Sequence, residues 1–574
     1  MTVGLVEEFT RRTVVGWVSV PAGTPPTRVS LHIGNFPVVR TYATPGPAVS
    51  GIHVGGDGSV EMPTPRSDSA ATPGGRSRMI KGPPGDRRNS REEIRTFSFR
   101  IADIWPYVKR GHRLTVRVDD RPLPIYRHGM FLRSRRDGDL GLRELKQKFD
   151  EGYVLSQMGR IQLSKRLDTS WQNRSMELYT RVREILTEEH GYDAFLMYGT
   201  LLGAVREGGY IGHDADFDAG YVSSRRNGPE AAAELVEIAM TMIRHGLGAD
   251  LRARLLHVHH PEDDDFHIDL FHTYFEDGVH RFPFGIAGTT RLLESDWTGT
   301  HDIDFPGGRA AVPNNAEQLV EHLYGEEWRR PKPGFNWRLD RTDHAQEAQL
   351  TEEQRAKVYW ASFYARTEYT SGSSFFELVN ARPDMPATVI DIGCGDGRDS
   401  CAFGRAGRTV LGVDQSPVGI RRAVEHAERN EVADRVRFRE CDVADVEQLG
   451  RLIDEAVEPA NGPVMFYLRF FLHAVPEDVQ EGLLTAIRAH SRPGDLFAAE
   501  FRTDQDALRV KVHGKHYRRF QNAAEFRTSL VERFGFEVLH EREGTGLSPF
   551  GDEDPVLYRV VARRDARSMS HAVR

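Results

Sequence analysis

The order of apolar and polar positions divides the chain into three segments of different periodicity. In the first segment, residues 1–135, short alternating or β-branched runs recur between turn residues at 13–20, 28–33, 96–101 and 113–118. Because successive side chains of a strand point to opposite faces, this pattern predicts a small β-sandwich-like module. Residues 44–91 are instead rich in Gly, Pro, Ser and Arg, which predicts a disordered insert within that module.

In the second segment, residues 140–340, apolar residues recur at spacings of three and four. This spacing predicts helices over 142–155, 171–191 and 229–246. Short apolar runs predict strands at 194–199, 254–260 and 266–275. The alternation of helices and strands indicates a central α/β domain with a mixed sheet.

The third segment follows a linker at about 330–350 and covers residues 351–565. The stretch PATVIDIGCGDGRDSCAF, which begins at Pro386, predicts a buried strand, a glycine-rich turn and a helix. A second strand ends at Asp414, and 464–475 reads as a further core strand. The pattern predicts a Rossmann-like α/β domain.

Composition narrows the class of protein. A chain of 574 residues is too long for a single core, so several domains are expected. The formal net charge of -8 gives no reason to expect a nucleic-acid partner. Three cysteines without metal-ligand spacing suit a reducing compartment, and no apolar run approaches the length of a membrane span. We therefore predict a cytoplasmic protein with at most peripheral contact at the inner face of the membrane.

Carboxylates gather at the end of the stretch Tyr198–Asp218, YGTLLGAVREGGYIGHDADFD. Asp216 and Asp218 are two positions apart, so both point to one face of an extended strand. Like charges at that distance repel unless a cation screens them, and carboxylate oxygens suit Mg2+ or Mn2+. The alternative is a solvated acidic turn, which the apolar residues around the pair disfavour.

Asp269 is the candidate third ligand. It lies between Ile268 and Leu270 in the run HIDLF, which is an unfavourable place for a carboxylate without a partner. If its strand lies beside the one that carries Asp216 and Asp218, the three carboxylates converge and can hold metal ions against a polyphosphate. The alternative is an edge-strand aspartate that faces water.

Three ordered motifs carry a family resemblance: the stretch from Tyr198, the run HIDLF, and VPNNAEQLVEHLYGEEWRRP at Val312–Pro331. Together they resemble the LicD/fukutin phosphotransferases of the nucleotidyltransferase-like superfamily. The resemblance implies transfer of choline, ribitol or glycerol phosphate from a CDP-linked donor to a glycan or lipid-linked glycan. Ala215 departs from the family pattern, which has two acids before the aspartate pair, and this weakens any role for Asp214.

The residues agree with that chemistry. A turn at Gly199 and Thr200 offers backbone N–H groups and a hydroxyl to a phosphate. Arg206 is a candidate partner of the diphosphate, although a surface arginine is an equal alternative. The acceptor proton can go to Asp214 or to Asp269.

A histidine cluster at 257–267 also invites a zinc interpretation. Alternation puts His257 and His259 on one face of a strand, with His260 and His267 close in sequence. No cysteine joins them, so polar packing or substrate contact is the favoured interpretation.

The glycine-rich turn of the third segment is the second candidate site. Gly393, Gly395 and Gly397 follow the carboxylate of Asp391, which repels a pyrophosphate but suits a cationic amino acid. That charge selects S-adenosylmethionine over NAD. With Asp414 after the next strand, and a further acid at Asp442, the segment resembles class I S-adenosylmethionine-dependent methyltransferases.

This second resemblance implies the roles of the acids. Asp391 and the three glycines would hold the methionine end of the cofactor, Asp414 the ribose hydroxyls, and Asp442 the adenine. The methyl acceptor would face the end of the 464–475 strand, so the candidates there are Tyr467, Arg469 and His473, the last as a general base or a structural residue. Arg518, in the basic run GKHYRRF, either binds an anionic acceptor or faces solvent.

We therefore predict a bifunctional enzyme of cell-envelope glycan assembly, acting on a capsule, teichoic-acid or O-antigen-like polymer. The central domain transfers a phospho-alcohol, and the C-terminal domain methylates the product at a hydroxyl or a phosphate as a chain cap. Two alternatives stand beside this: a methyltransferase with a degenerate, glycan-binding central domain, and a non-enzymatic assembly platform.

Overall fold

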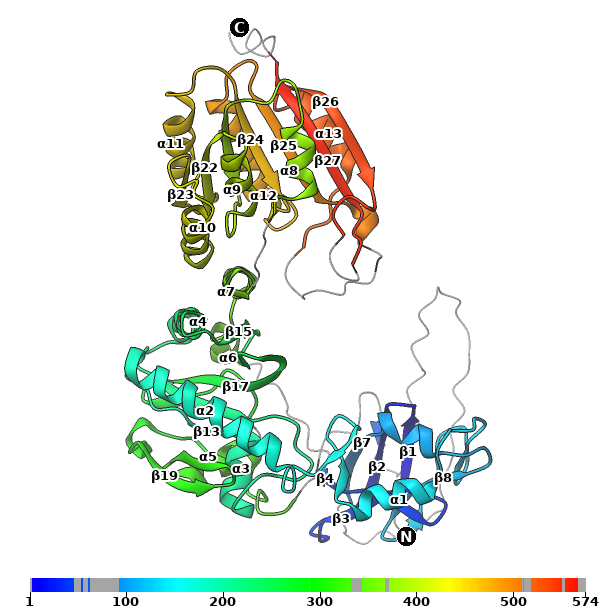
Figure 1. Cartoon of the computed structure of the whole chain (residues 1–574). Coiled ribbons are helices and arrows are strands. Elements are labelled where there is room, and N and C mark those ends of the chain that lie inside the picture. The colour runs from blue at the N-terminus through cyan, green and yellow to red at the C-terminus, as the bar shows by residue number, and fades with distance from the viewer. Residues whose placement is uncertain are drawn as a thin grey trace. The chain divides into compact units, whose positions relative to one another are not determined.

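The computed structural model describes residues 3–45, 53–54, 60–61, 92–286, 288, 290–331, 343–366, 371–507, 509, 518–549 and 553–565. Its main elements belong to three sheets, each described by itself (Figure 1). Within these residues, no helix is both long enough and apolar enough to traverse a bilayer.

The N-terminal sheet is antiparallel throughout. Its strands are β1 (Val3–Phe9), β2 (Thr13–Pro21), β3 (Thr27–Ile33), β4 (Phe36–Pro45), β7 (Glu92–Arg100), β8 (Arg113–Val118), β9 (Arg121–Pro122) and β10 (Leu132–Arg133). They pair in the order β1-β2-β7-β4-β3-β8-β10, with β9 on β8. Alternate residues such as Val14, Phe97 and Val116 are buried in its core, which confirms the strands expected from the alternating pattern.

The predicted insert at 44–91 lies mostly outside the described residues. The described part contains the end of β4 and a pair of short strands, β5 (His53–Val54) and β6 (Val60–Glu61). After the sheet, a 3-10 helix (Ala102–Tyr107) adds Ile104 and Tyr107 to the core.

The central part begins with α1 (Leu142–Asp150), the hairpin β11 (Tyr153–Leu155) and β12 (Ile161–Leu163), and α2 (Thr169–His190). The prediction of one helix over 142–155 was wrong in its second half. Gly152 adopts a left-handed φ of 92°, which ends the helical segment and turns the chain into β11.

The central sheet has the order β13-β14-β17-β16-β15, with β18 also paired to β17. Its elements are β13 (Phe195–Leu196), α3 (Tyr198–Glu207), β14 (Asp218–Ser223), α4 (Gly228–Arg244), β15 (Gly248–Leu251), β16 (Leu256–His260), β17 (Asp263–Glu276) and β18 (Val279–Arg281). A hairpin of β19 (Thr300–Phe305) and β20 (Gly308–Pro313) and the helix α5 (Ala316–Tyr324) follow. The strand with Asp269, β17, is therefore the neighbour of β14, which is the condition under which we expected the three carboxylates to converge.

The C-terminal part starts with α6 (Asp343–Glu347), α7 (Glu352–Arg366) and α8 (Ser374–Asn380). Its sheet, coloured yellow to red in Figure 1, has the order β23-β22-β21-β24-β25-β27-β26. The strands are β21 (Thr388–Ile392), β22 (Thr409–Asp414), β23 (Val436–Glu440), β24 (Val464–Arg469), β25 (Leu496–Arg502), β26 (Phe536–Gly544) and β27 (Leu557–Arg564). The first five strands of that order are parallel, and β27 is antiparallel to both of its neighbours.

Helices cover both faces of this sheet, because its strands are apolar on both sides. One core joins Ile390 and Phe466 to side chains of α11 (Val446–Val457), α12 (Glu477–His490) and α13 (Ala523–Glu532). The other joins Val389 and Met465 to α8, α9 (Arg398–Arg405) and α10 (Pro417–Arg429). The run 464–475, predicted as one strand, is β24 only as far as Arg469.

Candidate active sites

The first site is built where β13 passes into α3. The sequence suggested a turn at Gly199 and Thr200, but both residues lie in the first turn of α3, so that prediction was wrong. The Gly199 N–H donates to Asp218 Oδ2 (2.9 Å), and the Asp218 N–H donates to Thr200 Oγ1 (2.8 Å). Asp218 is thus held at a helix N-terminus, where the unpaired N–H groups favour negative charge.

Glycine is required at position 199 by close approach. A Cβ on Gly199 would lie 2.5 Å from Asp214 Oδ2 and 3.3 Å from Asp218 Oδ2. The preceding residue, Tyr198, has a φ of 40°, a left-handed conformation that is rare for an aromatic residue and stores backbone strain. The backbone therefore bends sharply at Tyr198 and lets two carboxylates reach the helix start.

Three of the predicted ligands come together. Asp216, Asp218 and Asp269 each offer an oxygen within 4.8 Å of the other two. Asp218 and Asp269 are buried, whereas Asp216 is exposed. Asp216 precedes β14 rather than lying in it, so the expected geometry of two residues on one strand was wrong, although the carboxylates still converge.

The electrostatics of this cluster call for a cation or protons. At this separation, and at an effective dielectric of about 20, two ionised carboxylates repel by roughly 3 kcal/mol. Burial, followed by the charge of Asp216, raises the pKa of Asp214 well above its ordinary value. The hard oxygen donors and their partial burial fit Mg2+ or Mn2+.

Two other polar residues of this domain are Tyr324 and Arg206. Tyr324, the last residue of α5, was not assigned from the sequence, and burial together with Asp218 and Asp214 raises the pKa of its hydroxyl. Arg206, the candidate diphosphate partner, pairs with Glu207 (2.8 Å) and donates to the Trp328 carbonyl (3.2 Å). Arg206 is therefore held by the protein rather than extended into solvent.

The second site is the glycine-rich turn after β21. Gly393, Gly395 and Gly397 all have a positive φ, between 56° and 76°, which explains why glycine stands at each of the three positions. A Cβ on Gly393 would lie 2.1 Å from the Phe471 ring, and one on Gly395 would lie 2.5 Å from the Tyr364 ring. The turn thus passes close beneath two aromatic side chains.

The acids predicted for this site lie around the turn. Asp391 is buried on β21 and accepts from Ser400 Oγ (2.6 Å), and burial raises its pKa to about 7. Asp414 ends β22 and accepts from the N–H groups of Gly395 (2.9 Å) and Ser416 (2.8 Å). Burial raises the pKa of Asp414 to about 6.

Two further residues of this site were missed. Asp396 is buried within the turn, and its Oδ2 has no hydrogen-bond partner among the described residues. Tyr364, on α7, packs over Gly395, and burial and Asp414 raise the pKa of its hydroxyl. Asp396 could have been found from the motif DIGCGDG itself, whereas Tyr364 is brought in by folding alone. The unsatisfied oxygen of Asp396 fits a cationic cofactor.

Asp442 is exposed just after β23. Its Oδ1 accepts from the Ala444 N–H (2.9 Å). It borders a pocket of about 300 Å3 lined by Lys357, Gln415, Glu440, Cys441, Asp442 and Gln448. Because Gln415 follows Asp414 directly, this pocket adjoins the end of β22.

The β24 candidates form a buried ion-pair network around Asp399. Tyr467 is fully buried, and its hydroxyl donates to Asp399 (2.7 Å), while Arg469 Nε lies 2.6 Å from the same carboxylate. Ser373 also donates to Asp399 (2.7 Å). Removing one partner of a buried ion pair costs about 3–5 kcal/mol, so replacing Arg469 tests folding before it tests substrate binding.

His473 lies in a turn before α12, and its ring is buried. Its Nδ1 accepts from the Arg502 N–H (3.3 Å), which puts the proton of the neutral ring on Nε2. With Nδ1 accepting this hydrogen bond and Nε2 protonated, the ring has no nitrogen ready to take a proton. The hydrogen bond therefore favours a structural role for His473 over that of a base. Phe470, three residues before His473, has a φ of 55°, so this site also contains a strained aromatic residue.

Arg518 is half-buried near Arg502, and both burial and Arg502 lower its pKa.

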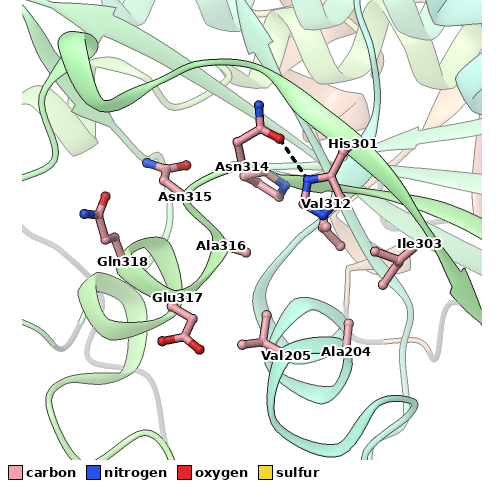
Figure 2. A pocket seen from close by; sticks show the side chains of 11 residues that line it. Ala204, Val205, His301, Ile303, Val312, Asn314, Asn315, Ala316, Glu317 and Gln318 are labelled. Atoms are coloured by element: carbon pink, nitrogen blue, oxygen red, sulfur yellow. Dashed lines mark hydrogen bonds between the residues drawn. The ribbon is translucent and has the colours of Figure 1, made fainter.

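Two further pockets lie elsewhere. Figure 2 shows one of about 470 Å3 between α3, the β19–β20 hairpin and the start of α5, where His301 and Asn314 are hydrogen-bonded (2.8 Å). Its amide side chains, Asn314, Asn315 and Gln318, suit a hydroxyl-rich ligand. The other, about 1280 Å3 in the N-terminal part, is lined by Trp105, Phe131 and the arginines 11, 110, 127, 133, 135 and 136.

Two stretches of the chain match known families. Residues 191–315 match the LicD/FKTN/FKRP nucleotidyltransferase domain, and residues 384–457 match a methyltransferase domain. Ubiquinone biosynthesis O-methyltransferase from Rhizobium leguminosarum bv. trifolii (strain WSM2304) is 26% identical over 195 residues, covering 33% of this chain and 76% of that protein. The corresponding enzyme of Methylobacterium nodulans is 28% identical over 196 residues, covering 31% and 72%.

Solved methyltransferases are among the structures to which the chain is similar. A methyltransferase from Anabaena variabilis has a TM-score of 0.28 and 20% identity, covering 36% of this chain and 93% of that one. A glycopeptide N-methyltransferase with S-adenosyl-L-homocysteine has a TM-score of 0.27 and 17% identity, covering 34% and 91%.

The family matches and the two sites define a multidomain enzyme with two transferase domains. The chain is a fusion of a LicD-family phosphotransferase-type domain and an S-adenosylmethionine-dependent methyltransferase domain.

Proposed function

We propose that this protein is a bifunctional enzyme of cell-envelope glycan assembly. The central domain transfers glycerol, ribitol or choline phosphate from a CDP-linked donor to a glycan, and the C-terminal domain O-methylates the product. The observation that carries the first activity is the convergence of Asp216, Asp218 and Asp269 within a LicD-family domain.

In the transfer step, an acceptor hydroxyl attacks the phosphorus of the phospho-alcohol, and the bond to CMP breaks. Phosphoryl transfer needs in-line positioning and neutralisation of developing charge. Mg2+ or Mn2+ held by Asp216, Asp218 and Asp269 would supply that charge. Asp214, or Asp269, takes the acceptor proton, and the α3 N-terminus at Gly199 orients Asp218.

In the methylation step, the acceptor oxygen would form a bond to the methyl carbon of the S-adenosylmethionine sulfonium, the S–CH3 bond would break, and S-adenosylhomocysteine would leave. Asp391, Asp396 and the three glycines would bind the cationic methionine end, Asp414 the ribose hydroxyls, and Asp442 the adenine side. A hydroxyl acceptor must lose a proton to a base, whereas an ionised phosphate needs none.

The fusion motivates a coupling of the two steps. Tethered sites share a high effective concentration of the polymer end, so a transferred phospho-alcohol can be methylated before it diffuses away. Methylation of the terminal group would then cap the chain against extension.

The proposal includes the folds of the N-terminal module and the central domain. We assign a β-sandwich-like fold to the N-terminal module, over about residues 1–135, and a nucleotidyltransferase-like fold to the central domain, over about residues 140–340. The arginine-rich pocket of the N-terminal part supports a role in holding an anionic polymer. Such an enzyme would work in the cytoplasm, at the inner face of the membrane where lipid-linked glycans are extended.

A donor screen tests the proposal. The full-length protein is incubated with Mg2+, an acceptor glycan, S-adenosylmethionine and either CDP-glycerol, CDP-ribitol or CDP-choline. We expect CMP release with one donor and methylated product in its mass spectrum. Absence of CMP with every donor would leave a methyltransferase with a glycan-binding central domain. If both Asp216→Ala and Asp391→Ala leave function in cells unchanged, the protein is a non-enzymatic platform.

Binding of S-adenosylmethionine should depend on pH. Asp391 has a pKa raised to about 7, so below pH 7 it is mostly protonated in the cofactor-free protein. The cofactor's positive charge favours the ionised carboxylate, so binding must displace that proton. We expect the affinity, measured by calorimetry, to fall by up to about tenfold per pH unit below pH 7. In Asp391→Asn the slope between about pH 6 and 7 should disappear; an equally steep slope in that variant would contradict the assignment.

A further inference from the structure

Three histidines converge on one face of the central sheet, at the junction of β16 and β17. The two strands are antiparallel, with His259 opposite His267 and His257 opposite Asp269. His257 and His259 are two positions apart on β16, as are His267 and Asp269 on β17, so all four side chains share a face. The register therefore builds a compact patch of three imidazoles and one carboxylate.

The contacts within this patch are close. His257, His259 and His267 each offer a ring nitrogen within 4.8 Å of the other two. The rings of His257 and His267 stack with centroids 4.2 Å apart, and those of His259 and His267 lie 5.1 Å apart. Asp269 Oδ1 is 3.4 Å from His257 Nε2 and 3.7 Å from His267 Nε2. All three histidines are half-buried.

This donor set differs in kind from the neighbouring acidic one. Imidazole nitrogens favour Zn2+ and related transition metals, whereas carboxylate oxygens alone favour Mg2+ or Mn2+. Three histidines and one carboxylate match the four ligands of a tetrahedral zinc site, in which ligand atoms lie about 3.3 Å apart. The observed spacing therefore needs only a small inward rotation of the rings. Packing of neutral rings alone does not require a carboxylate beside them, whereas Asp269 Oδ1 lies near the ring nitrogens of His257 and His267.

One cation lies at the edge of the patch. Arg252 Nε is 3.4 Å from His257 Nδ1, and its Nη2 is paired with Asp250 Oδ2 at 2.7 Å. A ring that binds metal through Nε2 carries its proton on Nδ1, so metal binding would displace this long contact. Arg252 should therefore oppose metal binding, which provides a variant with an effect of the opposite sign.

We propose that His257, His259 and His267 bind a transition-metal dication of the Zn2+ class, with Asp269 as a fourth ligand. Asp269 also belongs to the acidic group with Asp216 and Asp218, so one carboxylate would serve a nitrogen-rich site and an oxygen-rich site. The bound metal would fix the orientation of that carboxylate. The proposal concerns metal binding and stands whether or not the central domain transfers a phospho-alcohol.

Metal titration of the full-length, chelator-treated protein tests the site. We expect one high-affinity equivalent of Zn2+ by calorimetry, and Co2+ should give the strong visible absorption of a four-coordinate ion. His257→Ala and His267→Ala should weaken Zn2+ binding by more than about 100-fold, since changes to partners of metal ligands already cost 10–100-fold. Arg252→Gln should tighten it.

The matched control is His260→Ala. His260 is on the same strand, but its ring lies against Phe266 and its Nδ1 accepts from the Glu262 N–H, so this variant should bind Zn2+ as the parent does. Asp216→Asn should also retain Zn2+, which separates this site from the acidic one. Lack of a stoichiometric Zn2+ ion in the parent protein, or equal losses in the His257 and His260 variants, would overturn the proposal. The parent titration decides the matter even if a histidine variant does not fold.

Discussion

Replacing Asp216 by Asn is expected to abolish CMP release from the CDP-linked donor. The change removes one of the three converging charges but keeps the size of the side chain, and Asp216 is exposed, so folding should be preserved. A metal ion contributes several kcal/mol to stabilising the charge of a phosphoryl transition state. Loss of about 4 kcal/mol corresponds to a rate lower by about 10³-fold. The rate of CMP release measures it directly.

The control for this variant is Asp302→Asn. Asp302 is an exposed residue of β19, and its ion pair with Arg309 spans 3.9 Å. This variant should release CMP at the parent rate, and both variants should methylate a small acceptor normally. CMP release by Asp216→Asn within about tenfold of the parent rate would show that the acidic group is not the transfer site.

Replacing Asp414 by Ala should remove most of the affinity for S-adenosylmethionine. The Asp414 carboxylate ends β22 and is held by the N–H groups of Gly395 and Ser416, so it is oriented before any ligand binds. Two hydrogen bonds from ribose hydroxyls to a charged acceptor contribute about 1.5–3 kcal/mol each. Their loss predicts an affinity weaker by at least about 100-fold, measured by calorimetry with S-adenosylmethionine.

Asp434→Ala is the matched control, because Asp434 is exposed and its pairing with Arg435 at 3.7 Å is a surface contact of small energy. It should bind the cofactor as the parent does. CMP release should be unaffected in Asp414→Ala, which separates a local effect from unfolding of the chain. Unchanged affinity in Asp414→Ala would place the ribose elsewhere.

The two sites share a construction that sequence patterns do not reveal. In each, an aromatic residue with a positive φ follows a strand: Tyr198 opens α3 after β13, and Phe470 comes directly after β24. Such a conformation costs of order 1–3 kcal/mol and persists only where the surrounding packing enforces it. In both cases the bend occurs beside the candidate chemistry: Asp218 at the start of α3, and the turn with His473.

Much of the local structure could be predicted because its causes are local. Alternation marked β2, β3, β7 and β8, and spacings of three and four marked α2 and α4. The spacing of acids and glycines around Asp216 and Asp391 indicated a metal site and a cofactor site, and the resemblance of these motifs to two known families indicated the two classes of transferase. The predicted boundaries of elements were wrong where a single backbone angle decided them, as at Gly152. They were also wrong where the start of a helix has the residues of a turn, as at Gly199.

The tertiary structure decided which distant residues meet. Strand register set His257 opposite Asp269, and packing brought Tyr324 beside the acidic group and Tyr364 over Gly395. Folding also buries Tyr467, a candidate for contact with the methyl acceptor, where its hydroxyl donates to Asp399. Sequence periodicity records which face of an element is apolar, but not which element covers that face. The motifs of the sequence alone therefore indicated the two transferase classes and their acids. How these acids and their partners are arranged in space was decided by folding.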